Sequence, residues 1–267
     1  MSFASLMVYF DGTAVSYPRL RLAVDLANRL GATLIGVAGR SYLSPLFVSS
    51  NDQREADEQQ VLKEAENKFR QEGRRLMHVE WRGIPDDATN VVTNQARAAD
   101  LIIIGREQGT DNWVYAVNPG ITILRAGRPV LVIPEGIEVL TARRIMVAWK
   151  DTREARCAVR DVIPFLKQAE KVTIVEICEH GTATKSQRHL DDVAQYLFGH
   201  QIVVADKASL ETEQTLADAL LSFAKDNNTD LIVAGGYGHS RLGEWIFVGV
   251  TRSLLMGDSP ICNLFSH

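Results

Sequence analysis

The sequence is poor in the features that mark secreted, disulfide-bonded or zinc-binding proteins. It has three cysteines in 267 residues, Cys157, Cys178 and Cys262, and no two of them stand at C-x-x-C spacing. All three lie in apolar stretches, so we expect small buried side chains in a reducing compartment, with no disulfide and no zinc. Residues 1–10 lack the basic start of an export signal, and Asp11 follows too early for its apolar core, so a cytoplasmic location is expected.

Charge and hydropathy favour neither a nucleic acid nor a membrane as partner. Lys and Arg number 29 against 33 Asp and Glu, a net charge of −4, so the chain has no broad positive field that would attract a polyanion or an anionic membrane surface. No uninterrupted apolar run approaches the roughly 20 residues that a membrane-spanning helix needs. The 46% of apolar residues indicate a globular chain, with room for two domains of about 130 residues.

Several catalytic and nucleotide-binding signatures are also missing. The chain has no P-loop, no Gly-x-Ser-x-Gly elbow, no His-Glu-x-x-His and no His-x-x-His pair. The glycines from Gly235 to Gly238 do not form a dinucleotide fingerprint, because Arg241 stands where a further glycine is needed. We therefore assign no catalytic residue and no metal ligand, and a slow nucleotide hydrolase is the least favoured of the functions considered.

An internal repeat with a period of about 130 to 140 residues organises the chain. Ala99–Gly105 corresponds to Thr229–Gly235, and in each half an apolar run led by a proline follows. Leu6–Asp11 likewise corresponds to Ile145–Asp151, and each is an apolar run that ends at an aspartate. The repeat predicts two domains, residues 1–137 and residues 138–267.

Each half alternates short β-branched runs with segments of helical period, which is typical of parallel strands joined by crossover helices. The fold class predicted is α/β, with two open parallel five-stranded sheets in tandem and helices on both faces. A charged helix is expected at Asn51–Glu72, and another is expected to start at Asn118–Gly120. The expected strands are residues 4–10, 32–38, 77–81, 100–105 and 129–133, then 144–150, 171–178, 200–205, 230–235 and 260–265.

A ligand in such a sheet binds at the carboxyl ends of the strands, where the strand order reverses, so we examine the loops after the first and fourth strands. In the second half the fourth strand is followed by the glycine-rich run 235–241 and then by Gly249-Val250-Thr251 at an expected helix start. Glycines let the backbone approach a phosphate, while Ser240, Thr251 and His239 offer donors. The same residues also suit a turn and a helix cap without any ligand, and both interpretations stay open.

Taken together, these features resemble a tandem universal stress protein. The resemblance rests on the aspartate that ends the first strand, the Gly-x-x-Gly after the fourth, the Gly-Val-Thr-Arg that follows, and the run Val147–Ala155. It implies the universal stress protein, adenine nucleotide alpha hydrolase-like fold with strand order 3-2-1-4-5, and a role in the stress response. It also implies that ATP or AMP binds chiefly to the second half, with Mg as a candidate companion.

The resemblance also assigns site residues, one by one. Ala148 and Asp151 are expected to face the base. The ribose and phosphates are expected at Gly235, Gly238, Ser240, Gly249 and Thr251, with His239 as a further donor to phosphate. The sequence departs from the family pattern at Val248, which stands where the pattern has a glycine and would crowd a triphosphate.

The first half departs further, because Gly105–Gly109 lengthens the glycine spacing and puts Glu107 where an anion would approach. We expect this half to bind ATP poorly and to act as a structural partner. The apolar last strands predict an intramolecular pseudo-dimer of the two domains, and a homodimer is a second arrangement. The competing hypothesis is a scaffold with vestigial sites, or a protein that holds another small molecule.

Overall fold

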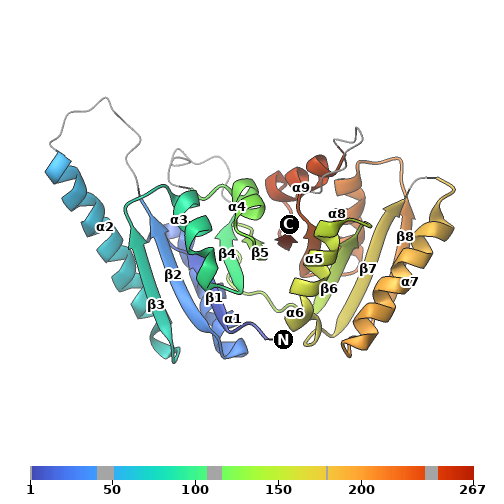
Figure 1. The fold of residues 1–267 in the computed structure, drawn as a ribbon, viewed down its shortest axis with the longest axis horizontal. Coiled ribbons are helices and arrows are strands. Elements are labelled where there is room, and N and C mark those ends of the chain that lie inside the picture. The colour runs from blue at the N-terminus through green and yellow to red at the C-terminus, as the bar shows by residue number, and fades with distance from the viewer. Residues whose placement is uncertain (1, 41–50, 107–115, 179, 238–245) are drawn as a thin grey trace. The chain divides into compact units, whose positions relative to one another are not determined.

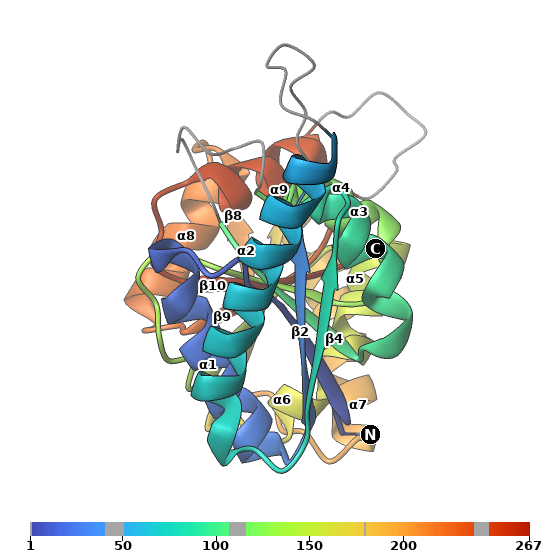
Figure 2. The ribbon, with the colours of Figure 1, turned by 90° about the vertical axis from the view of Figure 1, so that its left-hand side faces the viewer.

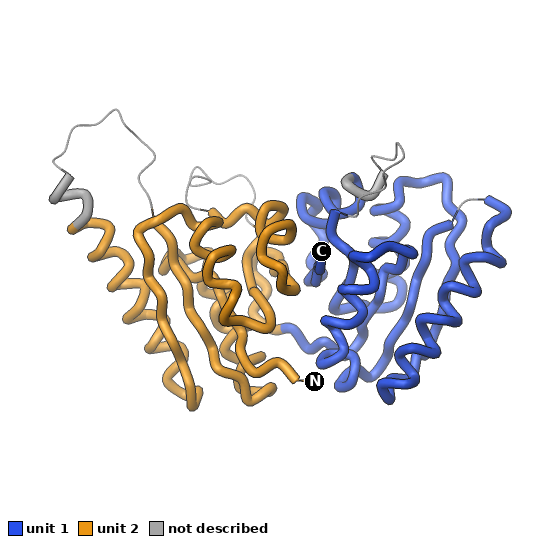
Figure 3. Tube along the Cα trace, viewed as in Figure 1, with its two compact units in different colours: residues 1, 140–267 blue, residues 2–139 orange. Residues whose placement is uncertain are grey.

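The computed structural model describes residues 2–40, 51–106, 116–178, 180–237 and 246–267, and of residues 51–55 and 246–248 only the backbone. The chain divides into two compact units, which Figure 3 distinguishes by colour. The first is Ser2–Val139 and the second contains Leu140–His267. None of the described helices is both long enough and apolar enough to cross a membrane.

Five parallel strands form the centre of the first unit, in the order β3-β2-β1-β4-β5. Figure 2 shows α1 and α2 on one face of these strands and α3 and α4 on the other. The elements are β1 (Ser5–Tyr9), α1 (Tyr17–Leu30), β2 (Thr33–Gly39), α2 (Asn51–Glu72), β3 (Val79–Ile84), α3 (Ala88–Gln95), β4 (Leu101–Gly105), α4 (Pro119–Arg125) and β5 (Val130–Ile133), with short 3-10 turns at Ala14–Ser16, Gly73–Arg75 and Ala96–Ala98.

The second unit repeats this arrangement, with parallel strands in the order β8-β7-β6-β9-β10. In Figure 1, α5 and α7 lie in front of these strands and α8 lies behind them. The predicted α/β fold and the strand order 3-2-1-4-5 are therefore confirmed. The elements are β6 (Arg144–Trp149), α5 (Arg153–Asp161), α6 (Ile163–Leu166), β7 (Lys171–Cys178), α7 (Ala183–Gly199), β8 (Asp206–Glu211), α8 (Leu216–Asp226), β9 (Leu231–Gly235), α9 (Ile246–Met256) and β10 (Cys262–Ser266).

The central strands supply the core of each unit. Every residue of Leu101–Gly105 in β4 is buried, as expected for a strand that helices cover on both faces. Cys262 is buried in β10, but Cys157 and Cys178 are only half-buried, so the expected burial of all three cysteines is wrong for two of them. The core thus depends on aliphatic strands, and the cysteines contribute little to it.

One predicted strand is wrong. The apolar residues Ile202 and Val203 suggested a strand at 200–205, whereas the strand of the structure, β8, is Asp206–Glu211. Ile202 is buried below the end of α7, and Val203 is 75% exposed. Strand β8 is the last of the second unit and is half-exposed along its length, so it carries no apolar run by which the sequence could reveal it.

The repeated Asp-Leu pair of the sequence has a structural role that is the same in both units. In the first unit, Asp100 Oδ2 accepts hydrogen bonds from the backbone amides of Ala4 at 2.8 Å and Ser5 at 3.0 Å. In the second unit, Asp230 accepts from the amides of Arg143 at 2.9 Å and Arg144 at 3.1 Å. Each aspartate therefore ties the start of the fourth strand to the start of the first.

This role predicts that Asp230→Ala lowers the free energy of unfolding of the second unit by about 1–2 kcal/mol, because two backbone donors and the Thr141 hydroxyl lose a charged acceptor. Asp226→Ala is the matched control, since this exposed aspartate ends α8 near the same edge. Urea unfolding of both variants measures the difference. Equal stability of the two variants would show that the aspartate bonds are not structural.

Candidate ligand-binding site

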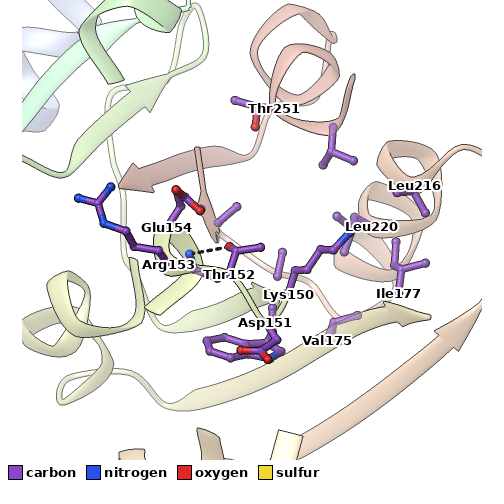
Figure 4. Close-up of a pocket in the computed structure, with 16 residues that line it drawn as sticks. Lys150, Asp151, Thr152, Arg153, Glu154, Val175, Ile177, Leu216, Leu220 and Thr251 are labelled. Carbon is purple, nitrogen blue, oxygen red and sulfur yellow. Dashed lines mark hydrogen bonds between the residues drawn. The ribbon is translucent and has the colours of Figure 1, made fainter. Parts of the chain in front are cut away.

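A pocket of about 580 Å³ lies in the second unit, at the carboxyl ends of its strands. Its lining comes from the ends of β6, β7 and β9, the first turn of α5, and from α8 and α9 (Figure 4). This is the edge at which the parallel sheet predicts a ligand, between the first and fourth strands of the unit. Its size is that of pockets that hold small organic ligands.

The structure brings four of the expected site residues together in this pocket. Ala148 and Asp151 line it from β6 and the loop that follows, Gly235 lines it from the end of β9, and Thr251 lines it from α9. Gly249 is exposed on α9 and is not part of the lining. Outside the described residues lie Gly238, His239, Ser240, the side chain of Val248 and the first-half run 107–109.

Gly235 is where β9 and α5 meet without a side chain between them. A Cβ built on this glycine would lie 2.6 Å from the backbone nitrogen of Ala155 and 2.9 Å from Cβ of Glu154. Real Cβ atoms do not come so close to backbone, so α5 can start at this point only because residue 235 is glycine. The bland interpretation of Gly235 as a packing residue therefore has a physical basis in the structure.

The loop from β6 into α5 is fixed by its own hydrogen bonds. Thr152 caps α5, and its Oγ1 accepts a hydrogen bond from the amide of Ala155 at 3.3 Å. Asp151 pairs with Arg156 at 2.5 Å, and both side chains are more than half exposed. The carboxylate that was expected to face a base is thus held at the rim of the pocket by a partner on the next helical turn.

Thr251 connects α9 to the start of the glycine-rich segment. Its hydroxyl oxygen accepts a hydrogen bond from the backbone nitrogen of Tyr237 at 3.4 Å, and Tyr237 has a positive φ of 52° that non-glycine residues seldom adopt. Burial raises the pKa of the Tyr237 phenol above its usual range, and the nearby Arg252 opposes this only in part. The segment is therefore held in a strained conformation by the helix that lines the pocket.

Sequence reasoning missed three charged residues of the lining, Lys150, Arg153 and Glu154. Figure 4 shows Lys150 reaching into the pocket on the side of Leu220. Glu154 is only 6% exposed, although a glutamate in the first turn of a polar-faced helix normally lies in water. The sequence carries a signal for the cap at Thr152, but none for the burial of Glu154.

The corresponding loop of the first unit is arranged differently. Asp11 Oδ1 accepts hydrogen bonds from the amide of Thr13 at 3.0 Å and from its hydroxyl at 2.7 Å. Helix α2 packs onto this loop, because Lys68 Nζ donates to the carbonyl oxygen of Gly12 at 3.1 Å and a Cβ on Gly12 would lie 3.2 Å from Ala65. The first aspartate is thus satisfied within its own turn.

No group of three or more His, Cys, Asp or Glu side chains in the described part of the chain is arranged to hold a metal ion. The described lining of the pocket offers two carboxylates, Asp151 and Glu154, and the first of them already pairs with Arg156. These residues do not form a Mg site by themselves, and we derive no step that depends on Mg.

The fold and the pocket define a tandem of open parallel α/β units with a small-molecule pocket at the carboxyl edge of the second. Residues 3–133, which include all five strands of the first unit, match the model of the Universal stress protein family. The chain belongs to this family, which confirms the resemblance that the sequence carries. The match falls on the half whose glycine loop departs from the family pattern.

Solved structures match nearly the whole chain. A universal stress protein from Archaeoglobus fulgidus DSM 4304 is 17% identical, with a TM-score of 0.70 over 97% of this chain and 94% of its own. A functionally unknown protein from Pseudomonas aeruginosa PAO1 is 13% identical, with a TM-score of 0.60 over 98% and 92%. A universal stress protein from Archaeoglobus fulgidus in complex with dAMP is 22% identical, with a TM-score of 0.33 over 51% and 99%. No curated protein matches the sequence.

The contact at Gly235 yields a prediction about stability. Gly235→Ala should destabilise the second unit by about 1–3 kcal/mol, because its Cβ must push the start of α5 away from β9. Gly249→Ala is the control: a Cβ there meets nothing within 4 Å, and in a helix it should be neutral or stabilise by up to about 1 kcal/mol. Urea unfolding of both variants distinguishes them, and two unchanged midpoints would contradict the close contact.

Proposed function

We propose that this protein is a stress-response protein whose second unit binds an adenine nucleotide, AMP or ATP, in the pocket at the carboxyl ends of β6 and β9. The observation that carries the proposal is the meeting of Ala148, Asp151, Gly235 and Thr251 around one pocket of about 580 Å³. Three separate stretches of sequence supply these residues, and the parallel sheet brings them to one edge.

The chemistry of the described lining supports a nucleotide in two ways. One wall is aliphatic, formed by Val175 and Ile177 of β7 with Leu216 and Leu220 of α8, and such a wall suits a flat heterocycle. Lys150 adds a cation that extends into the pocket (Figure 4), and the first turn of α5 adds the positive end of a helix dipole. A base and an anionic group therefore both find complementary surroundings.

The two loops after the first strands support the second unit, rather than the first, as the binder. In the first unit Asp11 is engaged by Thr13, and α2 packs against Gly12 through Ala65 and Lys68. In the second unit Asp151 is engaged only at the rim of an open pocket, by Arg156. The first unit then serves as the structural partner.

This proposal predicts that AMP or ATP raises the thermal midpoint of the purified protein, because a ligand that binds the native state stabilises it by about 2.7 kcal/mol at 100 times its Kd. Lys150→Ala should reduce the shift caused by AMP more than the shift caused by adenosine. Lys185→Ala is the control, since this lysine is exposed on α7 and is not part of the lining. Differential scanning fluorimetry measures all of these shifts.

Unchanged midpoints with AMP, ATP and adenosine at millimolar concentration would remove the binding proposal. The alternative would then be the scaffold, whose function lies in its surfaces and in association of its units or of whole chains. A pull-down of partners with the same protein sample separates that alternative from an inactive preparation.

A further inference from the structure

Glu154 is a buried carboxylate without a partner. Its side chain lines the pocket at the first turn of α5, and the residue is only 6% exposed (Figure 4). Within the described part of the chain, no hydrogen bond or ion pair reaches it. A carboxylate removed from water normally has donors around it, because its desolvation is otherwise uncompensated.

The groups nearest to Glu154 in the sequence are already engaged elsewhere. The amide of Ala155 donates to the cap Thr152, and the guanidinium of Arg156 pairs with Asp151 at the rim. Arg160, one turn further, pairs with Asp161. The dipole of α5 favours a negative charge at its first turn, but it supplies no hydrogen for the two carboxylate oxygens.

The position of Glu154 limits what can satisfy it. Its Cβ lies next to Gly235, so the carboxylate stands beside the end of β9, where the resemblance puts ribose and phosphate. A phosphate at that point would be repelled by a like charge in a partly dry pocket. A pair of neighbouring hydroxyl groups has the opposite character, because each hydroxyl donates one hydrogen bond and a carboxylate has two oxygens to accept them.

We propose that Glu154 accepts hydrogen bonds from the vicinal hydroxyl pair of the ligand's sugar, so that the pocket selects ribonucleosides and ribonucleotides with a free 2′,3′-diol. This inference rests on the proposed nucleotide function and makes it more specific. It assigns the sugar to the side of the pocket where α5 starts, and it requires the phosphate to lie away from Glu154.

Isothermal titration of the full-length protein with adenosine and with 2′,3′-dideoxyadenosine tests the assignment, because the two ligands differ only in the hydroxyl pair. The wild-type protein should bind adenosine at least about tenfold more tightly, as the loss of charge-assisted hydrogen bonds requires. In Glu154→Gln this ratio should fall to about two or less. The thermal midpoint of the unliganded variant should stay equal or rise, because an unpaired buried charge is removed.

Glu176→Gln is the matched control, since Glu176 is also buried in the second unit but bonds to His189 at 3.2 Å and does not line the pocket. This variant should keep the full preference for adenosine. Equal binding of both ligands by the wild type, or an undiminished ratio in Glu154→Gln, overturns the inference and leaves the nucleotide function standing. A marked fall in the midpoint of unliganded Glu154→Gln also overturns it, because the carboxylate would then be bonded inside the protein.

Binding of neither nucleoside, nor of AMP in the same titration, has a different meaning. It removes the proposed nucleotide function, and the assignment of Glu154 falls with it. AMP that binds while both nucleosides do not would also overturn the assignment, because the sugar would then contribute too little to be selected.

Discussion

The close approach of β9 and α5 at Gly235 is the contact on which the geometry of the pocket depends. Because no side chain separates the end of the strand from the backbone of Glu154 and Ala155, the helix starts directly at the sheet edge. That start brings the cap Thr152 and the loop residue Asp151 beside the strand ends and turns Glu154 out of water. One steric requirement of packing therefore also decides which polar groups a ligand would meet.

Much of the fold could be predicted because its signals are local. The helix Asn51–Glu72 has the bounds that its charged pattern indicated, and α4 starts at Pro119 behind the cap Asn118, whose side chain accepts from the amide of Ile121. Strand β8 could not be found in this way. An edge strand is half-exposed and needs no apolar run, so a buried apolar residue in the preceding loop, Ile202, gave the stronger signal.

The site divides along a similar physical line. Ala148, Asp151, Gly235 and Thr251 could be expected to meet, because parallel strands end at a common edge and the repeat fixes which strands are first and fourth. The burial of Glu154 could not be expected, since it follows from how closely α5 approaches β9 in space, and a glutamate early in a helix normally faces solvent. Topology is written in the pattern of the sequence, whereas the exposure of a single side chain is decided by tertiary packing.

The two edges of the sheet also differ in how far the units agree. At the amino edge, Asp100 and Asp230 make equivalent bonds to the starts of β1 and β6, and these bonds hold the central strands in register. At the carboxyl edge, the loop at Asp11 is satisfied within itself, whereas the loop at Asp151 borders a pocket. Loops at this edge carry little of the stability of the sheet, so one unit can differ from the other there without loss of the fold that both share.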